Sequence, residues 1–239
     1  MRGRKMWLKL AMMVAVLAVF VPAAEAGPEL ICFPHEIGGA KSLPWGGSGW
    51  HAARSDYDTS RLAANTLALL GSDVPVIVRM ETLRRAAIYA RRNARAGQEL
   101  LAQLEARARA AMMDTNADPL PAFDYGYFLE AHRQAFYIRA NGEGFDHSNA
   151  PPASLPRGYN WIVKALARRG NDAQMEYAAA LVSRLVQNRE ALARHSERAV
   201  TGASGDALLA RNLVRNGELL ALRGSSLTEI RASLAAARN

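Results

Sequence analysis

The segment DYGYFLEAHRQAFYIRA, residues 124–140, decides the fold of this chain. At helical spacing its apolar side chains fall on two neighbouring faces rather than on one. The first face holds Phe128, Ala131, Ala135 and Ile138, and the second holds Tyr125, Leu129, His132 and Phe136. A helix that is apolar on two faces is buried between partners. We therefore expect residues 124–140 to form the central helix of the fold.

An earlier segment that begins at Pro75 also has a helical pattern, but with a single apolar stripe. The stripe consists of Val76, Met80, Leu83, Ala87 and Ala90. Four arginines fall outside it, namely Arg84, Arg85, Arg91 and Arg92, and Glu81 can pair with Arg85 one turn further on. We therefore expect these arginines on the solvated side of a helix that Gly97 ends.

Helical patterns account for most of the remaining chain. They cover residues 60–70, 101–111, 159–169, 173–187, 190–199, 206–216 and 227–238, and Asp58 or Thr59 can cap the first of them. No run of residues alternates as a half-buried strand does. The sequence predicts an all-α fold of helical hairpins, arranged as a bundle or a short α-solenoid, in a single domain over residues 58–239.

The amino-terminal part of the chain is organised differently. Residues 1–26 combine a basic start, an apolar run and the small-x-small motif Ala24-Glu25-Ala26, as a cleaved signal peptide does. Residues 27–57, here called the strap, contain three prolines and several glycines that exclude a long helix or strand. We expect an exported protein, periplasmic or extracellular, with no transmembrane segment after cleavage.

Charge and motifs exclude several classes of function. The formal net charge is +8, but residues 1–26 hold four basic side chains against one acid, which leaves +5 spread along the predicted helices. This distribution lacks the basic stripe and interleaved aromatics of a nucleic-acid-binding protein. The stretch HEIGGAKS, residues 35–42, has neither the spacing of a phosphate-binding loop nor that of a zinc-protease motif.

Two clusters of potential metal ligands remain. The first is Cys32 with His35 and His51, which suits copper or zinc, or a Cys32 nucleophile with His35 as its base. The alternative is a buried structural cysteine beside a surface histidine. The second cluster, Glu143, Asp146 and His147, occupies a polar loop that would have this composition in any case. The other histidines are expected to be structural, with His132 at the edge of the core and His195 solvated.

The segment ALARRGNDAQMEYAAALVSRL, residues 165–185, resembles a helix-turn-helix of the tetratricopeptide and Sel1-like superfamily. Gly170-Asn171-Asp172-Ala173 occupies the turn, and Tyr177 lies on the second helix with three alanines after it. The resemblance covers about a tenth of the chain and implies protein–protein binding on a concave helical surface. The chain as a whole is similar to exported bacterial proteins rich in alanine and arginine.

These features favour an interaction or scaffold module of the bacterial envelope, whose partner is another envelope protein or peptide. The candidate binding surface consists of Tyr125, Tyr127, Tyr159 and Trp161. The alternative function is an envelope metal-binding or thiol-redox factor that uses Cys32 and His35. An enzyme is less favoured, because the glutamates nearest the apolar faces, Glu81 and Glu130, lie among arginines and are expected to be ion-pair partners rather than catalytic acids.

Overall fold

The computed structural model describes residues 28–136, 138 and 157–236, and in these ranges the chain is built of helices without a strand. The predicted all-α fold is therefore confirmed. The helices are α1 (Glu29–Cys32), α2 (Leu62–Ala68), α3 (Val76–Ala90), α4 (Ala94–Met113), α5 (Leu120–Ala135), α6 (Gly158–Arg169), α7 (Ala173–Leu185), α8 (Arg189–Gly202), α9 (Ala207–Arg215) and α10 (Leu227–Ala236), with short 3-10 turns at Thr59–Arg61 and Gly217–Leu220. The predicted signal peptide and the loop that holds Glu143, Asp146 and His147 lie outside the described residues.

Helix α5 is the central helix, as the segment 124–140 predicts. Every residue from 122 to 131 is buried, since α5 lies between α3, α4 and α6 and also contacts α1 and α7. The helix begins four residues earlier than expected, next to Pro119, and it ends at Ala135. Proline at the start of a helix is compatible with the fold because its missing N–H would have no intrahelical partner there.

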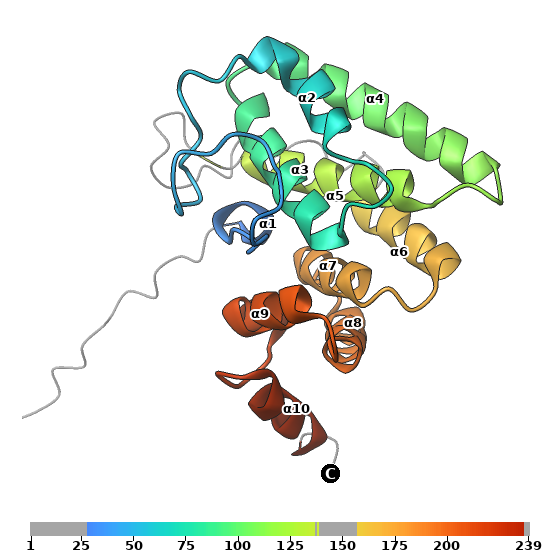
Figure 1. The fold of residues 1–239 in the computed structure, drawn as a ribbon. Helices are drawn as coiled ribbons and strands as arrows, with labels where there is room; N and C mark the ends of the chain where they lie inside the picture. The colour runs from blue at the N-terminus through green and yellow to red at the C-terminus, as the bar shows by residue number, and fades with distance from the viewer. Residues whose placement is uncertain (1–27, 137, 139–156, 237–239) are drawn as a thin grey trace, which may run out of the picture.

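The helices are stacked in layers from α2 and α4 at one end of the molecule to α10 at the other (Figure 1). Helix α8 packs along α7, and α10 closes the array against α8 and α9. Helix α10 fully buries only Ile230 and leaves most of its surface exposed.

Local sequence signals set the boundaries of the carboxy-terminal helices. Gly170 ends α6 with a positive φ of 81°, a conformation that favours glycine. Asp172, Asn188 and Asp206 then begin α7, α8 and α9, and each side chain accepts a hydrogen bond from the backbone N–H three residues further on. Each cap satisfies a backbone donor that has no partner within the helix. Asp58 likewise caps the turn before α2, as predicted.

The strap is irregular after α1, as its prolines and glycines indicate, and it belongs to the same hydrophobic core as the helices. Leu30, Ile31 and Leu43 are fully buried within that core. The strap therefore packs as part of the hydrophobic core and contributes to the stability of the helical fold. None of the helices formed by the described residues has the length and apolarity needed to cross a membrane.

Candidate functional site

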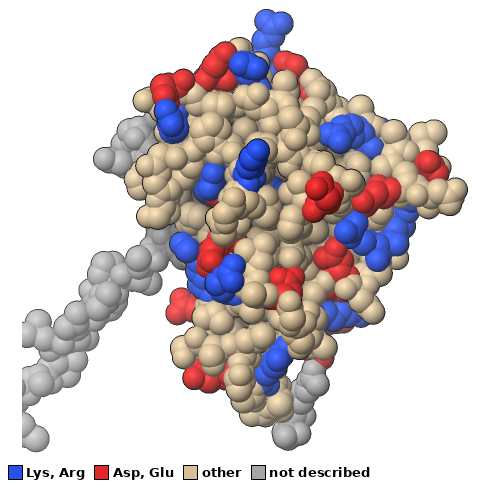
Figure 2. All heavy atoms as spheres, in the orientation of Figure 1, with Lys and Arg blue, Asp and Glu red and all other residues tan. Residues whose placement is uncertain are grey.

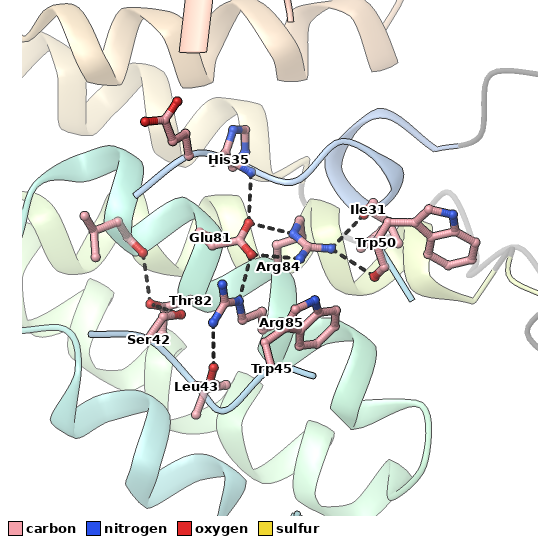
Figure 3. A network of polar contacts seen from close by, with 12 residues as sticks. Ile31, His35, Ser42, Leu43, Trp45, Trp50, Glu81, Thr82, Arg84 and Arg85 are labelled. Carbon is pink, nitrogen blue, oxygen red and sulfur yellow. Dashed lines mark hydrogen bonds and ion pairs between the residues drawn. The ribbon is translucent and has the colours of Figure 1, made fainter. Parts of the chain in front are cut away.

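The strap is held against the helices by a buried polar network centred on Glu81 of α3 (Figure 3). Arg84 donates two hydrogen bonds to the Glu81 carboxylate, at 2.7 and 2.8 Å, and the backbone N–H of His35 donates one at 3.0 Å. Burial by itself would raise the pKa of Glu81, but the hydrogen bonds and charge of Arg84, together with the charge of Arg85, lower it to about 2. Glu81 is therefore an ionised anchor for the strap.

Arg84 and Arg85 bind the strap directly through its backbone. Arg84 donates to the carbonyl oxygens of Ile31 and Trp50, at 2.9 and 3.2 Å, and Arg85 donates to that of Leu43 at 2.7 Å. The expectation that Arg84 is solvated is wrong, because its side chain is fully buried. Its donors are satisfied by a carboxylate on the preceding turn and by carbonyls of the strap, which removes the usual penalty for burying a guanidinium group.

A second buried ion pair joins α3 to α5. The guanidinium group of Arg79 donates to Asp124 Oδ2 at 2.6 Å and also to the carbonyl oxygens of Leu70, Gly71 and Val74. Asp124 Oδ1 is buried and has no hydrogen-bond partner among the described residues. Burial raises the pKa of Asp124 to about 6, although the charge of Arg79 opposes that shift. The pair ties two core helices together and leaves one acceptor unsatisfied.

His35 extends the network from Glu81 toward α5 and α7 and is almost completely buried. Its Nε2 lies 3.0 Å from the hydroxyl of Tyr127, and its Nδ1 lies 3.4 Å from that of Tyr177. Tyr177 in turn accepts a hydrogen bond from Asn216 at 2.8 Å. Burial lowers the pKa of His35 to about 4, so the ring is neutral near pH 7. Both ring nitrogens already have partners, which makes His35 a structural link between the strap, α5 and α7.

The other two candidate metal ligands lie in different environments. Cys32 is half-buried, and burial raises the pKa of its thiol to about 12, so the thiolate that binds metals or attacks disulfides is not formed near pH 7. His51 is exposed, and its ring packs edge-on against Trp50 at 5.1 Å. Within the described ranges, no group of three or more His, Cys, Asp or Glu side chains could hold a metal ion. The set Cys32, His35 and His51 is therefore not assembled in this structure.

The candidate partner-binding aromatics divide into two pairs. Tyr125 and Tyr127 are buried on α5, so the expectation that they belong to an accessible surface is wrong for this pair. The helices on both sides of α5 cover them. Tyr125 belongs to the second apolar face of the sequence pattern, whereas Tyr127 belongs to neither face. Tyr159 and Trp161 on α6 retain partial exposure. The ring of Trp161 lies edge-on to Tyr125 at 5.2 Å, with the ammonium group of Lys164 5.8 Å from its centre.

A further constellation, which the sequence did not suggest, joins three helices around His195 of α8. His195 is expected to be solvated, but only 3% of it is exposed. Its Nδ1 lies 2.5 Å from Glu176 Oε2 on α7, and its Nε2 lies 3.0 Å from the hydroxyl of Tyr159 on α6. One signal was present in the sequence, since His195 shares the buried face of α8 with Ala191 and Ala199 at a spacing of four residues.

The two glutamates considered as possible catalytic acids are ion-pair partners, as expected. Glu81 pairs with Arg84 and Arg85, and Glu130 lies 3.7 Å from Arg133 while it accepts a hydrogen bond from the backbone N–H of Gly158. The described residues thus offer two kinds of site, a structural network under the strap and the Tyr159–His195–Glu176 group. Comparison of the chain with protein-family models, with curated proteins and with solved structures gave no match.

Proposed function

We propose that the protein is an exported helical interaction module of the bacterial envelope and that it binds another protein or a peptide through α6. The observation that carries this proposal is the environment of Trp161. Its ring remains partly exposed while Tyr125 and Lys164 brace it. A large aromatic side chain held in place before binding loses little conformational entropy on contact, which is a property of the residues that dominate protein interfaces.

The exposed Lys164 beside Trp161 supports a partner with an acidic group. The other two basic residues of α6 are already engaged, because Arg168 donates to backbone carbonyls at the end of α4 and beyond it, and Arg169 pairs with Asp118 and Asp172. Elsewhere, basic and acidic side chains are interspersed on the face shown in Figure 2. The buried network under the strap supports the same function indirectly, because it fixes the helices that carry α6 and so keeps the surface preorganised.

The experiment that tests this proposal is crosslinking and pull-down from the native envelope with the full chain and with Trp161→Ala. We expect the substitution to remove the main crosslinked partner while the helical circular dichroism is retained. The matched control is Met113→Ala, which removes the most exposed large apolar side chain of the described residues, at the end of α4. A partner captured equally by the parent chain and by Trp161→Ala would overturn the assignment to α6.

A further inference from the structure

Tyr159, His195 and Glu176 form a hydrogen-bonded chain that runs from the interior toward the surface. Glu176 and His195 are 5% and 3% exposed, whereas Tyr159 retains partial exposure. The bond between His195 and Glu176 is buried, and the bond between Tyr159 and His195 is only part-buried. The chain therefore ends at a hydroxyl group that lies nearer to solvent than the two groups behind it.

The chemistry of the three groups sets the direction of the hydrogen bonds. A carboxylate can only accept, so the Nδ1–H of His195 donates to Glu176. In the neutral imidazole, Nε2 is then an acceptor, and the hydroxyl of Tyr159 donates its proton to it. The second oxygen of Glu176 accepts from Arg198 at 3.3 Å. This is the arrangement of a hydroxyl nucleophile, a base and a group that orients the base.

The geometry points to Tyr159 as a nucleophilic tyrosine that takes the acyl group of an activated carboxylic ester, with His195 as its base and Glu176 as a positioning residue. Tyr159 Oη bonds to the carbonyl carbon while its proton moves to His195 Nε2. The C–O bond of the ester breaks, and the leaving oxygen takes that proton. Water that gives a proton to the same nitrogen then cleaves the acyl-tyrosine, which releases the carboxylic acid and returns the proton to the phenol.

The nucleophile determines the class of substrate. A phenolate is a weaker base than an alkoxide, so Tyr159 displaces leaving groups that are no more basic than a phenol. The backbone N–H of Gly158 in the first turn of α6 is already bonded to the Glu130 carboxylate, so it does not serve the developing oxyanion. This chemistry at Tyr159 does not depend on the proposed binding of a partner through α6.

The test uses p-nitrophenyl acetate with the full chain, and peptide mass spectrometry follows acetylation of each tyrosine over time. Tyr57 serves as an internal control, because it is also partly exposed and its hydroxyl is hydrogen-bonded to the amide of Asn65 instead of to a histidine. At pH 7 we expect Tyr159 to be acetylated about a hundredfold faster than Tyr57, the lower end of the rate increase that a general base supplies. Equal rates at the two tyrosines would overturn the inference.

Three variants separate the roles of the three groups. Tyr159→Phe removes the adduct at position 159, and His195→Gln slows acetylation of Tyr159 to the rate of Tyr57. Glu176→Gln changes the pH profile of the reaction at Tyr159. If Glu176 were only structural, the substitution would leave that profile unchanged. If His195→Gln fails to fold, the pH dependence of acetylation in the parent chain still tests whether His195 is the base. The rate at Tyr159 should depend on pH differently from the rate at Tyr57, and parallel pH profiles would refute the proposed base.

Discussion

Gly126 and Gly158 lie backbone to backbone where α5 crosses α6. A Cβ atom on Gly126 would come within 2.6 Å of the carbonyl oxygen of Gly158, and one on Gly158 would overlap the carbonyl oxygen of Gly126. The backbone N–H of Gly158 also donates to Glu130, which places the first turn of α6 directly on α5. This contact brings Tyr159 and Trp161 into position.

We expect Gly158→Ala to lower the free energy of unfolding by about 3 kcal/mol, because the methyl group has no space and the two helices must separate. Chemical denaturation followed by circular dichroism measures the change. Gly39→Ala is the matched control, since a Cβ at Gly39 would have no atom within 4 Å. An unchanged denaturation midpoint for Gly158→Ala would show that the helices do not cross this closely.

Arg84→Met should destabilise the protein by about 3 kcal/mol, because it leaves Glu81 with fewer partners in a buried site and frees the carbonyl groups of the strap. The tryptophans of the strap, Trp45 and Trp50, should show a fluorescence change before global unfolding. The control is Arg109→Met, which removes an exposed ion pair with Glu105 on α4. Exposed pairs of this kind contribute about 0.5 kcal/mol or less. Similar effects of the two substitutions would contradict the role of the network.

His132 makes stability depend on pH. Burial lowers its pKa in the folded protein to about 4, below the ordinary value of 6.5, so the unfolded chain takes up a proton first as the pH falls. The contribution of His132 is therefore complete above pH 6.5 and is lost between pH 6.5 and 4. His132→Phe keeps an aromatic ring between Phe128 and Phe136 and removes the titration. Urea unfolding at several pH values should show a flatter profile for this variant, and an unchanged slope would argue against a neutral buried ring.

Asp124 should change the stability with pH in the direction opposite to that of His132. Its pKa in the folded protein is raised to about 6, so the folded chain holds a proton that the unfolded chain loses near pH 4. The contribution of Asp124 to stability is thus present below pH 4 and is lost as the pH rises to 6. Between pH 4 and 6.5, His132 makes the free energy of unfolding rise with pH, and Asp124 reduces that rise. Asp124→Asn removes the reduction, so the free energy of unfolding should rise more steeply with pH in this variant. An unchanged profile for the variant would mean that Asp124 has its ordinary pKa in the folded protein, and a shallower profile would mean that its pKa is lowered.

Export predicts a defined mature end. If the signal peptide is cleaved after Ala26, the chain isolated from the envelope should begin at Gly27, and amino-terminal sequencing reads this directly. Replacing Ala24 and Ala26 by bulky residues should leave the precursor uncleaved, whereas replacing Glu25 between them should not. A chain that begins at Met1 in the mature protein would contradict export by a cleaved signal.

Local patterns in the sequence predict most of the helices, the central position of α5 and the irregular strap. The expectation that Gly97 ends α3 is wrong, because α3 ends at Ala90 and Gly97 lies inside α4, which the side chain of Asn93 caps. These features depend on interactions within a few residues, such as the helical period of apolar side chains, the caps at Asp58 and Asp172, and the effect of proline and glycine on the backbone. The period of the apolar residues identifies which face of a helix is buried, and it correctly marks α5 as covered on two sides.

Only the tertiary structure decides which polar side chains are buried. Arg84 lies off the apolar stripe of α3 and is nevertheless fully enclosed, and His195 is buried with Glu176 and Tyr159 as its partners. A charged or polar group can be buried only where distant residues satisfy it, and no local pattern reports those residues. His35 illustrates this, because its two ring contacts come from residues 92 and 142 positions further along the chain. The chain's short-range preferences thus determine its helices, and the long-range pairing of polar groups determines its candidate site.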